Sequence, residues 1–299
     1  MTWPLAEFQI DVDVVSRILG EQHPDLAAGD LTFVGEGFDN SLWRLGREHL
    51  VRLPRHRVAV ELLRRELRWV PELADRITLP IPRPMRIGDP SSTFSAPWSI
   101  VPWLEGEPGD VSPITQIDDS SRRLGEFLRE MHQPAPIAAP TSEVRGVPLA
   151  RRQSSFDDQL VRAAHLVNSE AARAVWAHGL AATPWSSDPV WLHGDVHPGN
   201  ILLMDGMISA VIDFGDLCAG DPASDVAAAW LVLPEQGFTA FRDAYGRLDR
   251  MLERRALAWA VLFGLFFVNL GTEGRQNYEE IGHNALRQAI QHSRSLDGT

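Results

Sequence analysis

The chain has 299 residues, 44% of them hydrophobic and 23% charged, which is ordinary usage for a globular protein and excludes wholesale disorder. Its formal net charge of −12 argues against a nucleic-acid partner, because phosphate binding needs a basic face, and would suit a cationic small ligand. The single cysteine, Cys218, excludes an intramolecular disulfide, and the N-terminus lacks the pattern of a signal peptide, so we expect a cytoplasmic protein, monomeric or homodimeric.

The first hundred residues predict a small antiparallel sheet with helices beside it. Apolar residues at helical spacing predict an opening helix over 5–20, and a second, amphipathic helix is expected over 57–73. Runs of strand-forming residues between glycine and proline signals predict the following strands: 31–34, 41–45, 49–53, 85–87 and 98–101.

The rest of the chain is predominantly helical in character. The expected helices cover 115–132, 156–180, 222–233, 238–245, 249–270 and 275–293. The most apolar stretch, 256–270, is shorter than the roughly 20 residues that cross a bilayer and contains Asn269, so we expect a buried core helix and no membrane partner. Between residues 134 and 148 an Ala/Pro-rich connector, in part flexible, is expected.

Polar residues crowd the segment 191–216, WLHGDVHPGNILLMDGMISAVIDFGD, beside two short apolar strands. Asp195 and Asn200 precede a hairpin whose turn is Asp205-Gly206, and the second strand of that hairpin leads to Asp213. A short hairpin returns the chain to where it began. We therefore expect Asp195, Asn200 and Asp213 to converge at one end of the sheet.

These residue types suit phosphoryl transfer from a nucleotide. That reaction needs a carboxylate to accept the proton of an attacking hydroxyl, and oxygen ligands that hold Mg²⁺ on the phosphates. Asp195 suits the first role. Asn200 and Asp213 suit the second, because amide and carboxylate oxygens bind hard metal ions.

The two histidines of this segment have ordinary structural explanations. His193 is expected to be a packed, hydrogen-bonded loop residue, and His197 to bond to backbone. A zinc site of His193, Asp195 and His197 is an alternative, since all three are metal-ligand types, but Pro198 interrupts the extended segment that would align them.

The segments LHGDVHPGN, VIDFGD and GDPASDVA resemble the aminoglycoside phosphotransferase family of small-molecule kinases, relatives of protein kinases, and the similarity covers most of the chain. The resemblance implies an α+β, bilobal protein-kinase-like fold, with a small antiparallel sheet lobe and helix over 1–104 and a larger, mainly helical lobe over 105–299. It implies that Asp195 is the catalytic base and that Asp225 supports the catalytic loop through hydrogen bonds. The missing arginine after His193, and the missing downstream Ala-Pro-Glu, disfavour a protein substrate.

The nucleotide side is less distinctive. Kinases grip the α and β phosphates with a strand cation paired to a helix glutamate. Here the third strand offers Arg52 in place of lysine, and we expect Glu66 as its partner, with Glu61 in reserve. Arginine keeps the charge and can bind phosphate oxygens bidentately, but its planar head needs a different geometry.

Two further segments are candidates for nucleotide binding. The turn GEGFDNS could cover phosphates, with Gly35, Gly37, Asn40 and Ser41 as contacts, although an ordinary hairpin explains it equally well. In the connector SIVPWLEG, the resemblance implies that the nucleotide base meets the carbonyl of Pro102 and the amide of Leu104.

The sequence thus predicts a nucleotide- and Mg²⁺-dependent kinase, using ATP or GTP, that phosphorylates a hydroxyl of a small molecule such as an aminoglycoside or macrolide, which would confer antibiotic resistance. The alternatives are a nucleotide-binding pseudokinase, suggested by Arg52, or a kinase of a metabolite such as homoserine, choline or a sugar. Candidate acceptor contacts in the C-terminal helices are Asp157, Asp158, Asn269, Glu273, Tyr278 and Glu279.

Overall fold

The computed structural model of the chain describes residues 5–274 and 276–297. Two compact units divide the chain. The N-terminal unit runs to Glu105 and also takes in Ile212–Gly215, while the C-terminal unit comprises Gly106–Val211 and the residues from Asp216 onward. This division lies within one residue of the boundary expected between 104 and 105. The sequence did not indicate that the short segment carrying Asp213 belongs with the N-terminal unit.

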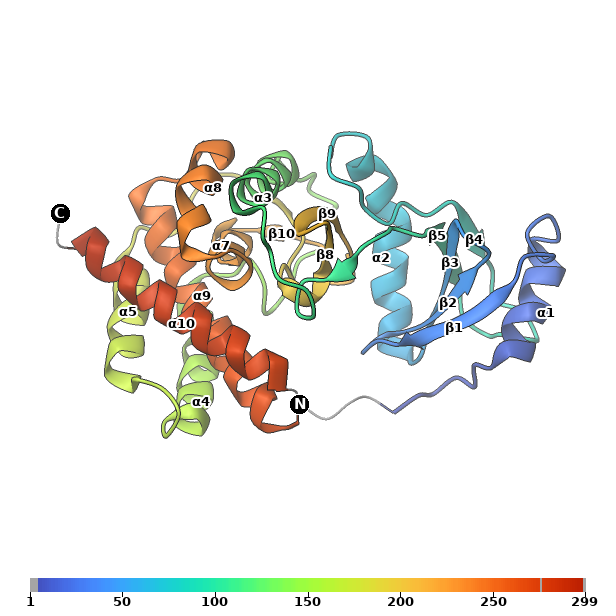
Figure 1. Cartoon of the computed structure of the whole chain (residues 1–299), viewed down its shortest axis with the longest axis horizontal. Coiled ribbons are helices and arrows are strands. Elements are labelled where there is room, and N and C mark those ends of the chain that lie inside the picture. The colour runs from blue at the N-terminus through green and yellow to red at the C-terminus, as the bar shows by residue number, and fades with distance from the viewer. Residues whose placement is uncertain (1–4, 275, 298–299) are drawn as a thin grey trace. The chain divides into compact units, whose positions relative to one another are not determined.

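The N-terminal unit contains an antiparallel sheet with the strand order β1-β2-β3-β5-β4 (Figure 1). The predicted strands are confirmed to within two residues at either end. Their bounds are β1 Leu31–Glu36, β2 Asn40–Leu45, β3 His49–Pro54, β4 Arg86–Gly88 and β5 Trp98–Pro102. Buried and half-buried residues alternate along β2, as expected for a strand with one face in a core.

The helices of this unit are α1 (Val12–Gln22) and α2 (Arg57–Ala74). The prediction for α2 is confirmed, but the predicted start of the opening helix at residue 5 is wrong. Asp11 accepts a hydrogen bond from the amide of Val14 at 2.9 Å and so caps the helix, which begins at the next residue. An N-terminal cap overrode the weak apolar periodicity that precedes it.

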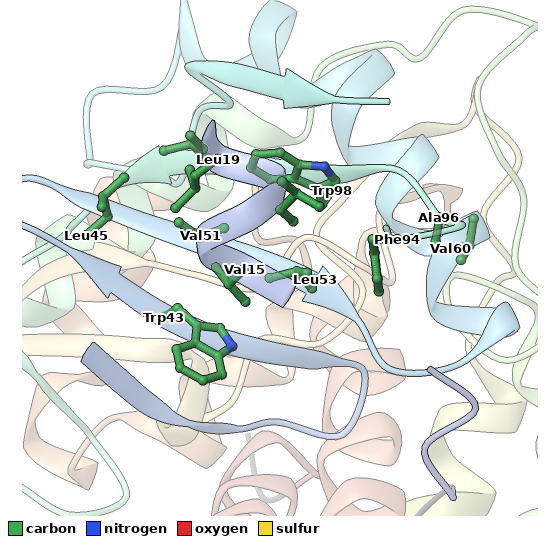
Figure 2. Close-up of a cluster of buried hydrophobic side chains, with 12 residues drawn as sticks. Val15, Leu19, Trp43, Leu45, Val51, Leu53, Val60, Phe94, Ala96 and Trp98 are labelled. Carbon is green, nitrogen blue, oxygen red and sulfur yellow. The ribbon is translucent and has the colours of Figure 1, made fainter. Parts of the chain in front are cut away.

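The core of the N-terminal unit lies between α1 and the sheet (Figure 2). Val15 and Leu19 from the helix pack with Trp43, Val51 and Trp98 from the strands, and all five are less than a tenth exposed. This packing makes the sheet a rigid mount for the polar side chains on it.

The helices of the C-terminal unit are α3 Ile117–Met131, α4 Gln153–Ala163, α5 Ser169–Ala181, α6 Ala223–Val226, α7 Ala228–Val232, α8 Phe238–Tyr245, α9 Arg250–Thr272 and α10 Gln276–Asp297. The predicted single helix over 156–180 is wrong, because Asn168 accepts a hydrogen bond from the amide of Ala171 and starts a new helix. The predicted helix over 222–233 is likewise divided. Arg275, the predicted start of the last helix, lies outside the described residues.

Helix α9 is the centre of the C-terminal unit. It contacts α4, α5, α6, α7 and α10. By length and composition alone it could cross a membrane, but 78% of its most apolar window is buried inside the protein. The prediction of a buried core helix is therefore confirmed for this segment.

Short strands position the polar loops of this unit. β6 (Glu107–Pro108), β8 (Ile201–Met204) and β9 (Met207–Val211) form one sheet, and β7 (Val190–Leu192) pairs with β10 (Cys218–Gly220). The predicted hairpin turn is confirmed: Asp205 and Gly206, with φ of 54° and 75°, join β8 to β9 in the left-handed conformation that tight hairpins require. Short 3₁₀ turns occupy Leu149–Arg152, Pro198–Asn200 and Glu235–Gly237.

Candidate active site

The backbone of the loop 193–200, between β7 and β8, is anchored by hydrogen bonds to Asp225 of α6. One carboxylate oxygen accepts a hydrogen bond from the amide of His193 at 2.7 Å, and the other accepts one from the amide of Gly194 at 3.0 Å. Asp225 is 1% exposed, so these are charge-assisted hydrogen bonds in a desolvated site. They fix the backbone of the loop at its first two residues.

A buried polar network that the sequence did not reveal lies behind Asp225. His132, at the end of α3, brings Nε2 within 3.4 Å of the Asp225 carboxylate, and its Nδ1 lies 2.9 Å from the hydroxyl of Tyr245 in α8. Burial raises the pKa of Tyr245, so this phenol stays protonated as a hydrogen-bonding group. No local pattern links residues 132, 225 and 245, because only tertiary packing brings them together.

Gly194 occupies a position that excludes a side chain. Its φ is +87°, and a Cβ atom there would lie 2.4 Å from the carbonyl oxygen of Asp216. This close approach accounts for the glycine found where protein kinases have the arginine of their His-Arg-Asp signature. A guanidinium instead reaches the loop from Arg145, in the connector after α3.

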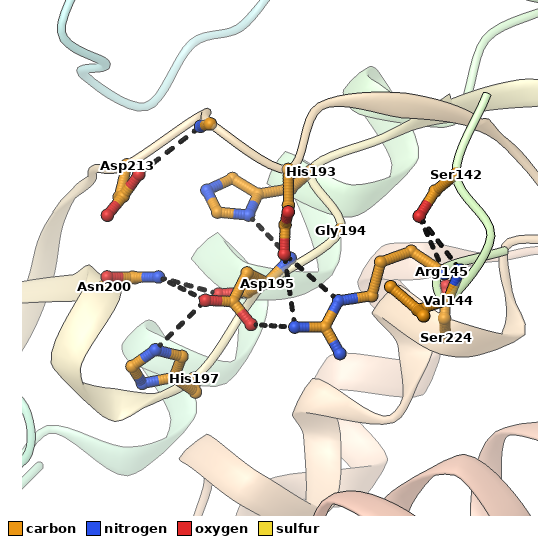
Figure 3. Close-up of polar contacts among 12 residues, drawn as sticks. Ser142, Val144, Arg145, His193, Gly194, Asp195, His197, Asn200, Asp213 and Ser224 are labelled. Carbon is orange, nitrogen blue, oxygen red and sulfur yellow. Dashed lines mark hydrogen bonds and ion pairs between the residues drawn. The ribbon is translucent and has the colours of Figure 1, made fainter. Parts of the chain in front are cut away.

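Asp195 stands at the centre of a polar cluster (Figure 3). The side-chain amide of Asn200 donates to its carbonyl oxygen at 2.9 Å and to its Oδ2 at 3.2 Å. His197 Nε2 lies 3.4 Å from the same Oδ2, and Arg145 Nη2 donates to Oδ1 at 2.7 Å. The Asp195 side chain is nevertheless 37% exposed, so a bound molecule can still reach the oriented carboxylate.

The surroundings of Asp195 decide its charge. Burial by itself would raise the pKa of this carboxyl, but the attraction of Arg145, and then of His197, holds the pKa well below its usual range. The carboxylate is therefore ionised at neutral pH. An ionised, oriented carboxylate can accept a hydrogen bond from a hydroxyl group and align it for attack.

The donor atoms expected to bind Mg²⁺ are hard oxygens. Because Asn200 commits Nδ2 to Asp195, its amide oxygen is the atom that can face a cation. In the N-terminal unit, Asp213 has a left-handed φ of 64° and accepts a hydrogen bond from the amide of Gly215 at 3.3 Å. An amide oxygen and a half-buried carboxylate are ligand types that suit Mg²⁺.

The zinc alternative receives no support. Each histidine uses Nδ1 within the loop: His193 accepts from the amide of Asp195 at 3.2 Å, and His197 accepts from the amide of Gly199 at 3.1 Å. Across residues 5–274 and 276–297, no group of three or more His, Cys, Asp or Glu side chains could hold a metal ion. The histidines instead shape the loop and orient Asp195.

Arg52 and Glu66 lie together inside the N-terminal unit. Two contacts join the guanidinium to the carboxylate, at 2.5 and 3.0 Å. Burial alone would lower the pKa of Arg52, but the attraction of Glu66, with smaller contributions from Asp213 and Asp39, raises it. Glu61, the reserve partner, instead pairs with Arg64 on the exposed face of α2.

The glycine turn after β1 is held by a residue that the sequence did not single out. Arg55 donates to the carbonyl of Gly37 at 3.1 Å and pairs with Glu36 at 2.8 Å. Gly37 in turn donates to the carbonyl of Asn40 at 2.8 Å, while Gly35 interrupts the regular register of β1. The turn is therefore anchored at both ends.

Ser41 is less accessible to a ligand than the connector after β5. The hydroxyl of Ser41 is buried and accepts a hydrogen bond from Trp43 Nε1 at 2.9 Å, so this side chain serves the packing of the sheet. Pro102 ends β5 and is half-buried, as is Leu104. The ring of Trp103 between them is covered by the guanidinium of Arg44, 4.1 Å from the ring centroid.

The candidate acceptor contacts of the C-terminal helices are occupied within the protein. Asp157 pairs with Arg173, and Glu273 pairs with Arg162. The remaining candidates with partners are Asn269, which donates to Gln159; Tyr278, which stacks on Phe267; and Glu279, 3.8 Å from His283. For Asp158 the structure gives no contact that assigns it a role.

The comparisons with known proteins agree with this architecture. Solved structures of similar fold include the GDP complex of aminoglycoside 2'-phosphotransferase-IIIa, with 19% sequence identity and a TM-score of 0.68, covering 93% of this chain and 98% of that one. A macrolide 2'-phosphotransferase from Brachybacterium faecium has 21% identity and a TM-score of 0.62, with 92% and 97% covered. A ternary complex of APH(2")-IIa with streptomycin and ATP has 15% identity and a TM-score of 0.60, with 87% and 91% covered.

At these identities the likeness to solved structures shows the fold, and comparison with the curated proteins gave no significant match. A family model described as the phosphotransferase enzyme family matches residues 30–260, more than half of the chain. The match confirms the resemblance inferred from the motifs around Asp195 and Asp213. The chain therefore belongs to this phosphotransferase family and has its α+β, protein-kinase-like fold.

Proposed function

We propose that the protein transfers the terminal phosphoryl group of ATP or GTP to a hydroxyl group of a small molecule. The observation that carries the proposal is Asp195: an ionised and partly exposed carboxylate, oriented by Asn200 on one side and by Arg145 on the other. Such a group can accept the proton of an attacking hydroxyl at the moment of transfer. The single cysteine of the chain, Cys218, is buried, which agrees with a cytoplasmic setting.

In this proposal the roles of the other residues follow from their contacts. Arg52, oriented by Glu66, would bind the phosphates of the nucleotide, and the backbone of Pro102 and Leu104 would meet its base. Asp225 would keep the loop in place without contacting the substrate, since both of its carboxylate oxygens bind backbone amides.

The metal that family membership implies fits the residues present. Asn200, through its amide oxygen, and Asp213, through its carboxylate, would hold Mg²⁺, because both are hard oxygen donors. When bound, the ion would neutralise charge on the phosphate oxygens. The hydrogen bonds of the loop support this role for Asn200. Its side-chain nitrogen donates to Asp195 and orients it, which leaves the side-chain oxygen to bind the cation.

The first acceptors to test come from the similar structures, whose titles name an aminoglycoside complex and a macrolide phosphotransferase. Phosphorylation of such an antibiotic would confer resistance. A survey of nucleotides and hydroxyl compounds with the purified wild-type protein identifies the donor and the acceptor. Nucleotide binding without transfer to any compound would instead favour a pseudokinase.

The variant Asp195→Asn tests the role of the carboxylate. It keeps the size of the side chain but removes the proton acceptor, so we expect a folded protein that has lost transfer by on the order of 10²–10⁴-fold. Its unfolding transition should fall moderately, because Arg145 loses one of its two carboxylate partners. Asp188→Asn, an exposed position, is the matched control. Near-normal transfer by Asp195→Asn would exclude Asp195 as the base.

A further inference from the structure

The connector between α3 and α4 is fixed on the C-terminal unit and is not a flexible linker. Backbone hydrogen bonds tie it to the strand pair β7 and β10: Ala135 donates to Pro189 at 2.9 Å, Ala219 donates to Pro140 at 2.8 Å, and Asp221 donates to Gly146 at 2.9 Å. The expectation of partial flexibility over 134–148 is therefore wrong for these points. Isolated backbone pairing with distant strands leaves no periodic pattern in the sequence.

Arg145 is held rigidly within this connector. Its own amide donates to the hydroxyl of Ser142 at 3.0 Å, and the amide of Gly146 donates to the hydroxyl of Ser224 at 3.2 Å. Gly146 has a φ of +61°, and a Cβ there would lie 2.3 Å from a methyl group of Leu192. The backbone on both sides of Arg145 is thus set before any ligand arrives.

The guanidinium of Arg145 bridges two carboxylates (Figure 3). Nη2 lies 2.7 Å from Asp195, Nε lies 3.2 Å from Asp216, and the head group lies 5.2 Å from the centroid of the Phe263 ring. The side chain of Arg145 is only 18% exposed. Arg145 therefore offsets one of the two negative charges that Asp195 and Asp216 would otherwise present to a cationic ligand.

Arg152 adds to the positive character of this region. Burial lowers its pKa, and the repulsion of Arg145 lowers the pKa further. Arg152 Nε is buried and has no hydrogen-bond partner among the described residues. This region accordingly offers positive charge and hydrogen-bond donors.

Aromatic rings border the other side of Asp195. The ring of His197, which contacts Asp195, lies 5.4 Å from the ring of Phe267, and Phe267 stacks on Tyr278 at 5.2 Å. Phe267 is buried, so His197 and Tyr278, which are partly exposed, provide the aromatic surface against which an apolar face could pack. Recognition of a polycation would instead need uncompensated carboxylates around the reacting hydroxyl.

We propose that Arg145 selects the acceptor: it favours hydroxyl compounds that are uncharged near the reacting hydroxyl and carry an apolar face, and it disfavours polycations. The inference rests on the proposed function, since it concerns the molecule that presents its hydroxyl to Asp195. It differs from the expectation of a cationic ligand drawn from the net charge of −12, because the local charge beside Asp195 differs from the average over the chain.

The test compares pairs of aryl glycosides that differ only in whether one hydroxyl is replaced by an amino group, with kanamycin as the polycationic reference. For each compound, kcat/KM is measured with wild type, Arg145→Gln and Arg145→Lys. Arg151→Gln, at an exposed position nearby, removes the same charge and is the control.

We expect wild type to prefer the neutral member of each pair. In Arg145→Gln the preference should shift toward the amino compound by about tenfold or more, because like charges near a binding site are strongly unfavourable. Arg145→Lys and Arg151→Gln should keep the wild-type ratio to within about threefold, since each leaves a cation beside Asp195. A structural defect alone would lower both rates and leave their ratio unchanged.

An unchanged ratio in Arg145→Gln, or a wild-type preference for kanamycin, would overturn the inference. If the wild-type protein transfers phosphate to no compound, the proposed function fails. The inference is then decided by calorimetric binding of the same pairs: a shift of binding preference toward the amino compound in Arg145→Gln supports it, and equal preferences in the two proteins refute it.

Discussion

Arg52 and Glu66 form a bidentate ion pair inside the N-terminal unit, with side chains that are 6% and 4% exposed. Removing one member of such a pair leaves a charge buried without its partner. We therefore expect Glu66→Gln to lower the free energy of unfolding by about 3–5 kcal/mol, and to weaken nucleotide binding because Arg52 loses its orientation. Denaturant unfolding and nucleotide titration measure the two effects.

Glu61→Gln is the matched control, because Glu61 lies in the same helix and pairs with Arg64 on an exposed face. Exposed helical pairs contribute little, so this variant should change the free energy of unfolding by less than about 0.5 kcal/mol. Equal changes in the free energy of unfolding for the two substitutions would show that the buried pair contributes no more to stability than the exposed pair.

Asp225→Asn tests the anchoring of the 193–200 loop. An asparagine can accept from one backbone amide, but its NH₂ group would face the other amide, so one of the two charge-assisted hydrogen bonds is lost. We expect kcat to fall with little change in the KM for nucleotide, because the loop that carries Asp195 shifts while Arg52 stays in place. Steady-state kinetics separates these constants. A change confined to KM would contradict the anchoring role, and Asp243→Asn, at an exposed site, is the control.

Much of this architecture could be predicted because its signals are local. Strands β2 and β3 are short runs of strand-forming residues between turn residues, and the Asp205-Gly206 turn closes a hairpin with short arms. The pairing of Arg52 with Glu66 could be proposed because the resemblance to kinases implies a strand cation that pairs with a helix glutamate.

The contacts that escaped prediction depend on tertiary packing. Arg145 lies 50 residues before Asp195 in a connector without periodicity, so nothing in the sequence links the two charges. His132 and Asp225 are 93 residues apart, and no sequence pattern indicates their contact. Helix ends were missed for a local reason. A single capping residue such as Asn168 outweighs the helix propensity of its neighbours.

Gly194 is expected to tolerate no side chain. Alanine there would have to adopt a φ of +87° and would place Cβ 2.4 Å from the carbonyl oxygen of Asp216. We expect Gly194→Ala to lower the free energy of unfolding by at least about 1 kcal/mol, since a left-handed backbone is costly for a non-glycine residue, and to reduce transfer further by displacing Asp195. Gly20→Ala, within α1 and with open space around it, should instead stabilise the protein by about 0.5–1 kcal/mol. Similar unfolding midpoints for the two variants would contradict the steric argument.

The acid limit of activity should depend on Arg145. Partial burial raises the pKa of Asp195, but Arg145 and then His197 and His193 hold it well below its usual range, and Asp216 shares the guanidinium. A carboxyl with a depressed pKa in the folded state contributes stability above its unfolded pKa and loses that contribution as the pH falls through the folded pKa. In the wild-type protein Asp195 should therefore stay ionised, and active as a base, at pH values below the ordinary aspartate pKa of about 3.9.

Arg145→Gln removes the largest attraction on Asp195, so the effect of burial gains weight and the acid limb of the transfer rate should move to higher pH. The profile of kcat/KM for a neutral acceptor, measured for both proteins over the range in which each stays folded, reports this shift. Because protonation of the nucleotide affects both profiles, the difference between the two profiles isolates the effect of Arg145. Arg151→Gln should reproduce the wild-type profile, and superimposable profiles for wild type and Arg145→Gln would show that the ion pair does not control the charge of Asp195.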